Sequence, residues 1–128
     1  MQALVFKSEE FGAKAVEAIQ PLILRPKPNS LQVLRIIDCQ ITAHITRQLI
    51  RNLRECNHIK VLGLVKAAIS DVAMQDLGVL VAESKWLSEL DISWNELKPQ
   101  SYNALIASLG MNKTLLTLNL SWNRIVDS

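Results

Sequence analysis

The chain has 128 residues, 49% of them hydrophobic, and its 14 basic and 12 acidic residues give a net charge of +2. These values are typical of one soluble globular domain. The basic residues are scattered, whereas nucleic-acid-binding proteins usually cluster them on one face. No apolar stretch approaches the roughly 18 residues needed to span a membrane. The first residues, MQALVFKSEEF, reach an acidic pair before any long apolar run and do not resemble a secretory signal.

Residues 1–30 are expected to form an N-terminal cap. The stretch EEFGAKAVEAI has the composition of a helix, and we predict a capping helix over residues 9 to about 20. Pro21 is expected to end this helix, since proline lacks a backbone N–H. LRPKPNS then reads as a Pro-rich turn. No strand is recognisable in MQALVFK.

Four segments with one common pattern follow, and their starts are 28 residues apart. They are LQVLRIIDCQI from Leu31, IKVLGLVKAAI from Ile59, LSELDISWNEL from Leu87 and LLTLNLSWNRI from Leu115. Positions one, four, six and eleven hold Leu or Ile in every copy, and position nine holds a small or hydrogen-bonding residue. Internal repetition at this period indicates a solenoid of stacked units.

Each unit is predicted to be a strand followed by a helix. The alternation of apolar residues at positions four and six is typical of a strand with one buried face. Apolar residues four apart, such as Leu49 and Leu53, indicate one face of a helix. The predicted strands lie within 33–37, 61–65, 89–93 and 117–121, and the predicted helices near 43–55, 72–83 and 100–110. The repeats are bounded as 31–58, 59–86, 87–114 and an incomplete 115–128.

The repeats resemble the leucine-rich repeat family, in its 28-residue, ribonuclease-inhibitor-like subgroup. The stretch YNALIASLGMNKTLLTLNLSWNRI is similar to the repeats of NOD-like receptors and of ciliary repeat proteins. The resemblance implies an α/β fold, a right-handed βα horseshoe segment with a parallel concave sheet and outer helices. It also implies that Cys39, Asn95 and Asn123, at position nine, turn inward and satisfy backbone groups where each strand bends. Ala67 occupies this position in the second repeat, so we expect a less regular or water-bridged loop there.

The two cysteines, Cys39 and Cys56, are expected to be unbonded. They are predicted on opposite sides of one repeat, and their spacing matches neither a metal site nor a thioredoxin-like motif. Two reduced thiols favour an intracellular, cytoplasmic protein, for which a cytoskeletal or ciliary assembly is one possibility.

The concave face carries the first candidate binding surface. Val33, Ile37, Val61 and Val65 lie at odd positions of the first two strands, between the inward-facing leucines. Apolar side chains exposed together usually mark an interface, and Gly63 among them allows close approach of another backbone. The alternative is that MQALVFK folds back over these side chains. Other charged or polar residues share this face, among them Arg35, Glu89 and Asp91, and the two carboxylates are expected to be solvated.

A second candidate surface is a row along one rim, formed by position eight of each repeat. It contains Asp38, Lys66, Trp94 and Trp122. The tryptophans are placed to stack, and Lys66 to meet either Asp38 or the Trp94 ring. The alternative role is a structural staple between repeats. Together, the candidate protein-binding residues are Val33, Arg35, Ile37, Val61, Val65, Lys66, Asp91, Trp94 and Trp122.

No catalytic arrangement is recognisable. His44 and His58 are predicted in turns of different repeats, without a convincing carboxylate partner, and a glycine-rich phosphate loop is missing. We therefore expect a non-catalytic protein–protein interaction scaffold without a cofactor, one segment or subunit of a larger intracellular assembly. Protein partners are expected to bind the concave face or the rim. Binding of nucleic acid or of a membrane is not expected.

Two other functions remain open from the resemblance. One is a GTPase activator of the Ran-activator type, and the other is a sensor or inhibitor module. The chain stops three residues past Ile125, where a fourth repeat helix would begin. Because solenoids need a polar cap on the last unit, we expect the open end to continue in a longer protein or to be covered by another chain.

Overall fold

The computed structural model describes residues 2–24, 31–56, 58–67, 69–95 and 98–120, and within them strands and helices alternate. The strands are β1 (Gln2–Lys7), β2 (Leu31–Ile37), β3 (Val61–Val65), β4 (Glu89–Asp91) and β5 (Thr117–Asn119). They form one parallel sheet in chain order. The helices are α1 (Ala13–Leu24), α2 (Ala43–Arg54), α3 (Asp71–Glu83) and α4 (Pro99–Met111).

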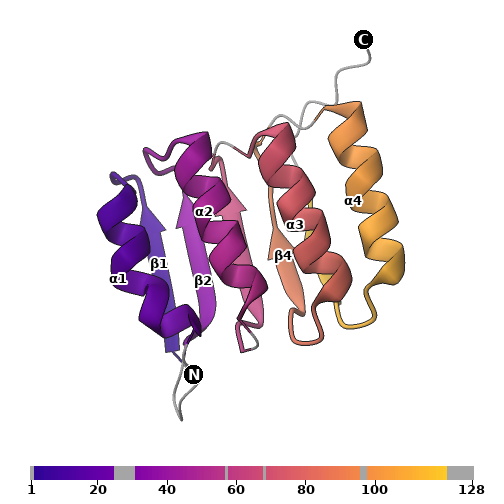
Figure 1. Cartoon of the computed structure of the whole chain (residues 1–128), viewed down its shortest axis with the longest axis horizontal. Coiled ribbons are helices and arrows are strands. Elements are labelled where there is room, and N and C mark those ends of the chain that lie inside the picture. The colour runs from indigo at the N-terminus through magenta and orange to yellow at the C-terminus, as the bar shows by residue number, and fades with distance from the viewer. Residues whose placement is uncertain (1, 25–30, 57, 68, 96–97, 121–128) are drawn as a thin grey trace.

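The helices lie side by side in one layer that covers one face of the sheet, as Figure 1 shows. Strand, helix and next strand therefore make one turn of a solenoid, and the predicted α/β architecture is confirmed. The bounds of α2, α3 and α4 differ from the predicted ones by one residue at most at each end. β3, β4 and β5 lie within the predicted spans, and β2 begins two residues before its span, at Leu31.

The sheet register follows the 28-residue alignment. Leu34 pairs with Leu62, Leu62 with Leu90, and Leu90 with Leu118. The first three of these leucines are at most 1% exposed. Position four of the repeat therefore forms a continuous ladder that packs beneath the helices.

The N-terminal segment corrects one expectation, because MQALVFK contains a strand. β1 pairs in parallel with β2, with Leu4 opposite Leu34 and Phe6 opposite Ile36. The segment thus extends the sheet at its edge as a further strand of the solenoid. It lies beside β2, and the alternative that it folds back over the valines is wrong.

The first helix also differs from its predicted span of 9 to about 20. It begins at Ala13 and continues to Leu24, with Pro21 inside it. Residues before Gly12 belong to the bend after β1, where Gln40 donates its N–H to the Glu9 carbonyl and accepts from Phe11 N–H, both at 2.8 Å. Pro21 lacks the N–H that would bond the carbonyl four residues earlier. That loss removes one hydrogen bond without ending the helix.

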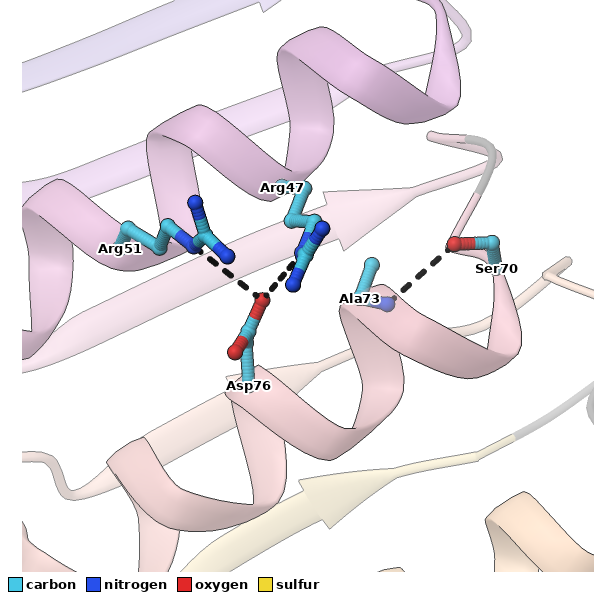
Figure 2. Close-up of polar contacts among 5 residues, drawn as sticks. All are labelled: Arg47, Arg51, Ser70, Ala73 and Asp76. Carbon is cyan, nitrogen blue, oxygen red and sulfur yellow. Dashed lines mark hydrogen bonds and ion pairs between the residues drawn. The ribbon is translucent and has the colours of Figure 1, made fainter.

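Polar contacts also join neighbouring helices. Figure 2 shows Arg47 and Arg51 of α2 converging on Asp76 of α3, with Nε to Oδ2 distances of 2.9 and 3.8 Å. In the same view, Ser70 caps α3 by accepting a hydrogen bond from the Ala73 N–H at 3.2 Å. The Asp76 side chain is only 16% exposed. Two guanidinium groups thus share one largely buried carboxylate and link consecutive repeats.

Candidate protein-binding surface

The strands β1 to β4 are each followed by the same backbone bend. Position eight is left-handed in four successive units, with φ of 56° at Ser8, 50° at Asp38, 51° at Lys66 and 63° at Trp94. The N–H of this residue reaches the next unit: Asp38 donates to the Val65 carbonyl at 2.9 Å, and Lys66 donates to the Ser93 carbonyl at 3.1 Å. The bend is thus held by bonds between repeats.

Asn95 at position nine satisfies the backbone at this bend, as the resemblance implied. Its Oδ1 accepts from the Ala67 N–H at 2.9 Å, and its Nδ2 donates to the carbonyls of Leu64 and Ile92 at 2.7 and 2.9 Å. The Cys39 thiol lies 3.5 Å from the Ile37 carbonyl. Asn123 lies outside the described residues.

The expectation of an irregular loop at Ala67 was wrong for its backbone. The bend there has the same left-handed residue as its neighbours. Ala67 brings no side-chain hydrogen bond, but other units supply them. Asn95 bonds its N–H, and the buried Thr46 hydroxyl donates to its carbonyl at 2.6 Å. A small residue is tolerated at this position because groups from both neighbouring repeats complete the bend.

The sheet face opposite the helices carries the predicted apolar residues. Positions four and six point into the core, so positions three, five and seven point the other way. Val33, Ile37, Val61 and Val65, which we call the aliphatic patch, are half-buried on that face. β1 extends the patch with Val5, which is 55% exposed.

A hollow of about 140 Å³ adjoins the patch over β3 and β4. Gly63 lies between Arg35 and Asp91 in the pairing register and projects no side chain into it. A Cβ on Gly63 would stand 3.2 Å from the Arg35 Cγ. The missing side chain leaves room for Arg35 to approach Glu89, with 3.9 Å between Nη2 and Oε2.

The two carboxylates near this hollow have different surroundings. The Glu89 side chain is 49% exposed, and Arg35 is its only cationic neighbour within the described chain. Asp91 is half-buried, and its Oδ1 accepts from the Ser93 N–H at 3.1 Å and the Ser93 hydroxyl at 2.8 Å. Asp91 has no cationic partner among the described residues.

The rim row is present in part. Lys66 Nζ lies 3.4 Å from Asp38 Oδ1, so of the two partners foreseen for Lys66 the structure has Asp38. Trp94 is 50% exposed. Trp122 lies outside the described residues, so its stacking on Trp94 stays a prediction.

The histidines and cysteines, the remaining residues that could carry chemistry, form no common site in the described part of the chain. The ring nitrogens Nδ1 and Nε2 of His58 are 2.6 and 2.9 Å from the carbonyl oxygens of Leu31 and Ile23, while His44 is exposed at the start of α2. Cys39 and Cys56 are buried thiols that form no disulfide, as expected. In the described part of the chain, no three His, Cys, Asp or Glu residues gather as metal ligands. None of the described helices combines the length and apolar character that a membrane crossing requires.

Comparison with known proteins adds one finding. The family model described as "Leucine Rich repeat" matches residues 83–100 and 112–128, which include β4 and β5. No curated protein matches the chain. Leucine-rich repeats generally mediate protein–protein interaction. The matched segments and the single parallel sheet backed by helices together support a leucine-rich repeat family for this chain.

Proposed function

We propose that the chain is a non-catalytic protein-binding scaffold whose interface is the sheet face opposite the helices. The observation that carries the proposal is the aliphatic patch on β2 and β3. Its four side chains are half-buried on a face that none of the described helices covers. Association with a protein would remove the rest of their apolar surface from water, which is the main favourable contribution at interfaces.

The other half of the same face is polar, which supports an interface with a defined orientation. Glu89 and Thr117 of β4 and β5 stand at the position that valines hold in β2 and β3, and Asp91 and Asn119 follow at the next outward position. Charged and polar groups beside an apolar centre set the register of a partner and exclude others. Arg35 of β2 reaches across the border between the two halves toward Glu89, with 3.9 Å between Nη2 and Oε2.

Site-specific photo-crosslinking tests this proposal. A photoreactive residue at position 61 should crosslink to a distinct protein in cell extract, identified by mass spectrometry, because Val61 is one of the four side chains of the patch. The same residue at exposed position 18 on α1 should not yield that product. Val61→Glu or Val65→Asp should abolish capture while the circular dichroism spectrum stays that of the folded chain.

Ala18→Glu is the matched control, since Ala18 is exposed on α1 in the helix layer, away from the proposed interface. Ser93 is a poor control, because it is 5% exposed and bonded to Asp91. Equal loss of capture in Val61→Glu and Ala18→Glu would contradict a role specific to the patch. Unfolding of Val61→Glu alone would point to a packing role, and Trp94 on the rim would then be the next candidate.

Membership of a larger intracellular assembly is the second part of the proposal. Leu109, Leu115, Leu118 and Leu120 of the last described unit are only partly buried. Their counterparts one repeat earlier, Val81, Leu87, Leu90 and Ile92, are at most 1% exposed. Another unit stacked on β5 and α4 would bury them. The buried thiols of Cys39 and Cys56, which form no disulfide, support an intracellular location. The 28-residue spacing supports the ribonuclease-inhibitor-like subgroup.

A further inference from the structure

We propose that the partner presents a basic side chain flanked by aliphatic side chains, with the basic group seated in the hollow beside Glu89 and Asp91. The inference rests on the proposed function and names the chemistry of the partner for that same face. The hollow is lined by Arg35, Val61, Glu89, Asp91, Thr117 and Asn119.

The register places the hollow beside the aliphatic patch. Arg35, Gly63 and Asp91 are successive pairing partners across β2, β3 and β4. Val61 belongs to the aliphatic patch and also lines the hollow, so the two surfaces are continuous. One extended segment of a partner can reach from one to the other with about three residues, since each residue advances about 3.3 Å.

The charges of the described residues favour a cation in the hollow. Two carboxylates, Glu89 and Asp91, face one guanidinium, that of Arg35. The Arg35–Glu89 pair is long at 3.9 Å, and its side chains are 35% and 49% exposed. Such exposed pairs contribute little, so Arg35 neutralises the hollow incompletely. Asp91 is half-buried and lacks a cationic partner in the described chain. A second cation therefore gains a favourable site, and an acidic partner is repelled.

Shape supports the same choice. A Cβ at position 63 would stand 3.2 Å from the Arg35 Cγ, so glycine there lets the Arg35 stem lie close to β3 at one wall of the hollow. The hollow is small, about 140 Å³, and mixed in character, with the Val61 side chain on one wall and carboxylates on another. A lysine or arginine fits such a site, because its methylene stem packs on apolar surface while its head pairs with a carboxylate.

A peptide-display library of random dodecamers, selected on the full 128-residue chain, tests the inference. We expect enrichment of peptides with Arg or Lys within three residues of Val, Ile or Leu. The selected peptide, synthesised with a fluorescent label, should bind about tenfold more weakly to Asp91→Asn, which corresponds to about 1.4 kcal/mol. Replacing the basic residue of the peptide by Gln should weaken binding to the parent chain by a similar factor. The same peptide change should alter the affinity for Asp91→Asn very little, because the basic residue and Asp91 interact with each other.

The controls separate this inference from the proposed function. Glu17→Gln removes an exposed carboxylate on α1, in the helix layer, and should leave binding unchanged. Gly63→Ala should weaken binding several-fold, because the added methyl group would press on the Arg35 stem at the wall of the hollow. Selected peptides that fail to bind the Val61→Glu variant and yet contain no basic residue would overturn the inference and leave the proposed function standing. So would peptides that fail to bind Val61→Glu and yet bind the Asp91→Asn variant as tightly as the parent chain. Peptides indifferent to Val61→Glu, or no enrichment at all, would count against both.

Discussion

Asn95 accepts a hydrogen bond from the backbone N–H of Ala67, one repeat earlier, at 2.9 Å. The same side chain donates to the carbonyls of Leu64, Ile92 and Ser93. One residue thus satisfies backbone groups on both sides of a repeat boundary, in a place where Asn95 is 8% exposed and water has little access. This explains how a repeat with alanine at position nine keeps a regular bend.

Replacing Asn95 should therefore destabilise two repeats at once. We expect Asn95→Ala to lower the free energy of unfolding by about 2–4 kcal/mol, because several buried backbone groups lose their partners. Urea denaturation measures the loss. Asn103→Ala, at an exposed site on α4, is the control and should change the free energy of unfolding by less than about 0.5 kcal/mol. Equal effects in the two variants would contradict the role assigned to Asn95.

A core cavity should have a local effect in a solenoid. Leu90 is 1% exposed at the centre of the ladder, and Leu90→Ala should cost about 2–5 kcal/mol. Since each repeat contacts only its neighbours, hydrogen exchange should accelerate most in β3, β4 and β5. Leu116→Ala removes a side chain that is 86% exposed and serves as the control. Exchange that accelerates evenly from end to end would rule out the nearest-neighbour account.

His58 connects the unit containing β1 and α1 with those that follow, since its ring lies between the carbonyls of Ile23 and Leu31. His58→Ala removes these contacts and should cost about 1–3 kcal/mol through unsatisfied carbonyl groups. Limited proteolysis should then cut the N-terminal unit faster. His44→Ala, at an exposed residue, should leave the cleavage rate unchanged. Faster cleavage confined to the C-terminal units would contradict the prediction.

The ionised carboxylate of Asp71 stabilises the folded chain, and this contribution is lost at acid pH. The hydrogen bond from the Ser101 hydroxyl, 2.8 Å from Oδ1, and the charge of Lys98 lower the pKa of Asp71 below its ordinary value of 3.8. Because the pKa is depressed in the folded chain, the stabilisation is present above 3.8 and is lost as pH falls through the folded pKa. NMR titration should show the low pKa in the parent chain and a higher one in Ser101→Ala. An unchanged pKa in that variant would contradict the assigned cause.

Much of the fold could be predicted from the sequence, because the repeated leucines mark the positions that are buried in the core. Leu62 and Leu90 are 28 residues apart in the sequence, and in the sheet they pair with each other. The N-terminal strand was missed for a physical reason. Leu4 pairs with Leu34 thirty residues later, and Glu9 stands where the other units have a small or amide side chain. The apolar residues Leu4, Phe6 and Phe11 carried the signal, since they occupy positions four, six and eleven.

The candidate surface was predictable in part. Alternation alone placed Val33 and Val61 on the face opposite the core, and the structure has them there, half-buried. The hollow was not predictable, because it depends on Arg35 leaning past Gly63 toward Glu89, a side-chain conformation that strand spacing does not determine. Likewise, the choice of Lys66 between Asp38 and Trp94 depends on rotamers.

The left-handed bend at position eight has an evolutionary consequence. Serine, aspartate, lysine and tryptophan all adopt it in successive units, and at Ser8, Asp38 and Lys66 the N–H of this residue donates to a backbone carbonyl of the next unit. The conformation costs a residue with a Cβ some free energy, yet the identity of the side chain hardly matters to the bend. Mutation can therefore change the chemistry of the rim one repeat at a time, from acidic to basic to aromatic, while the solenoid beneath stays the same. Selection for new partners can act there independently of selection for folding.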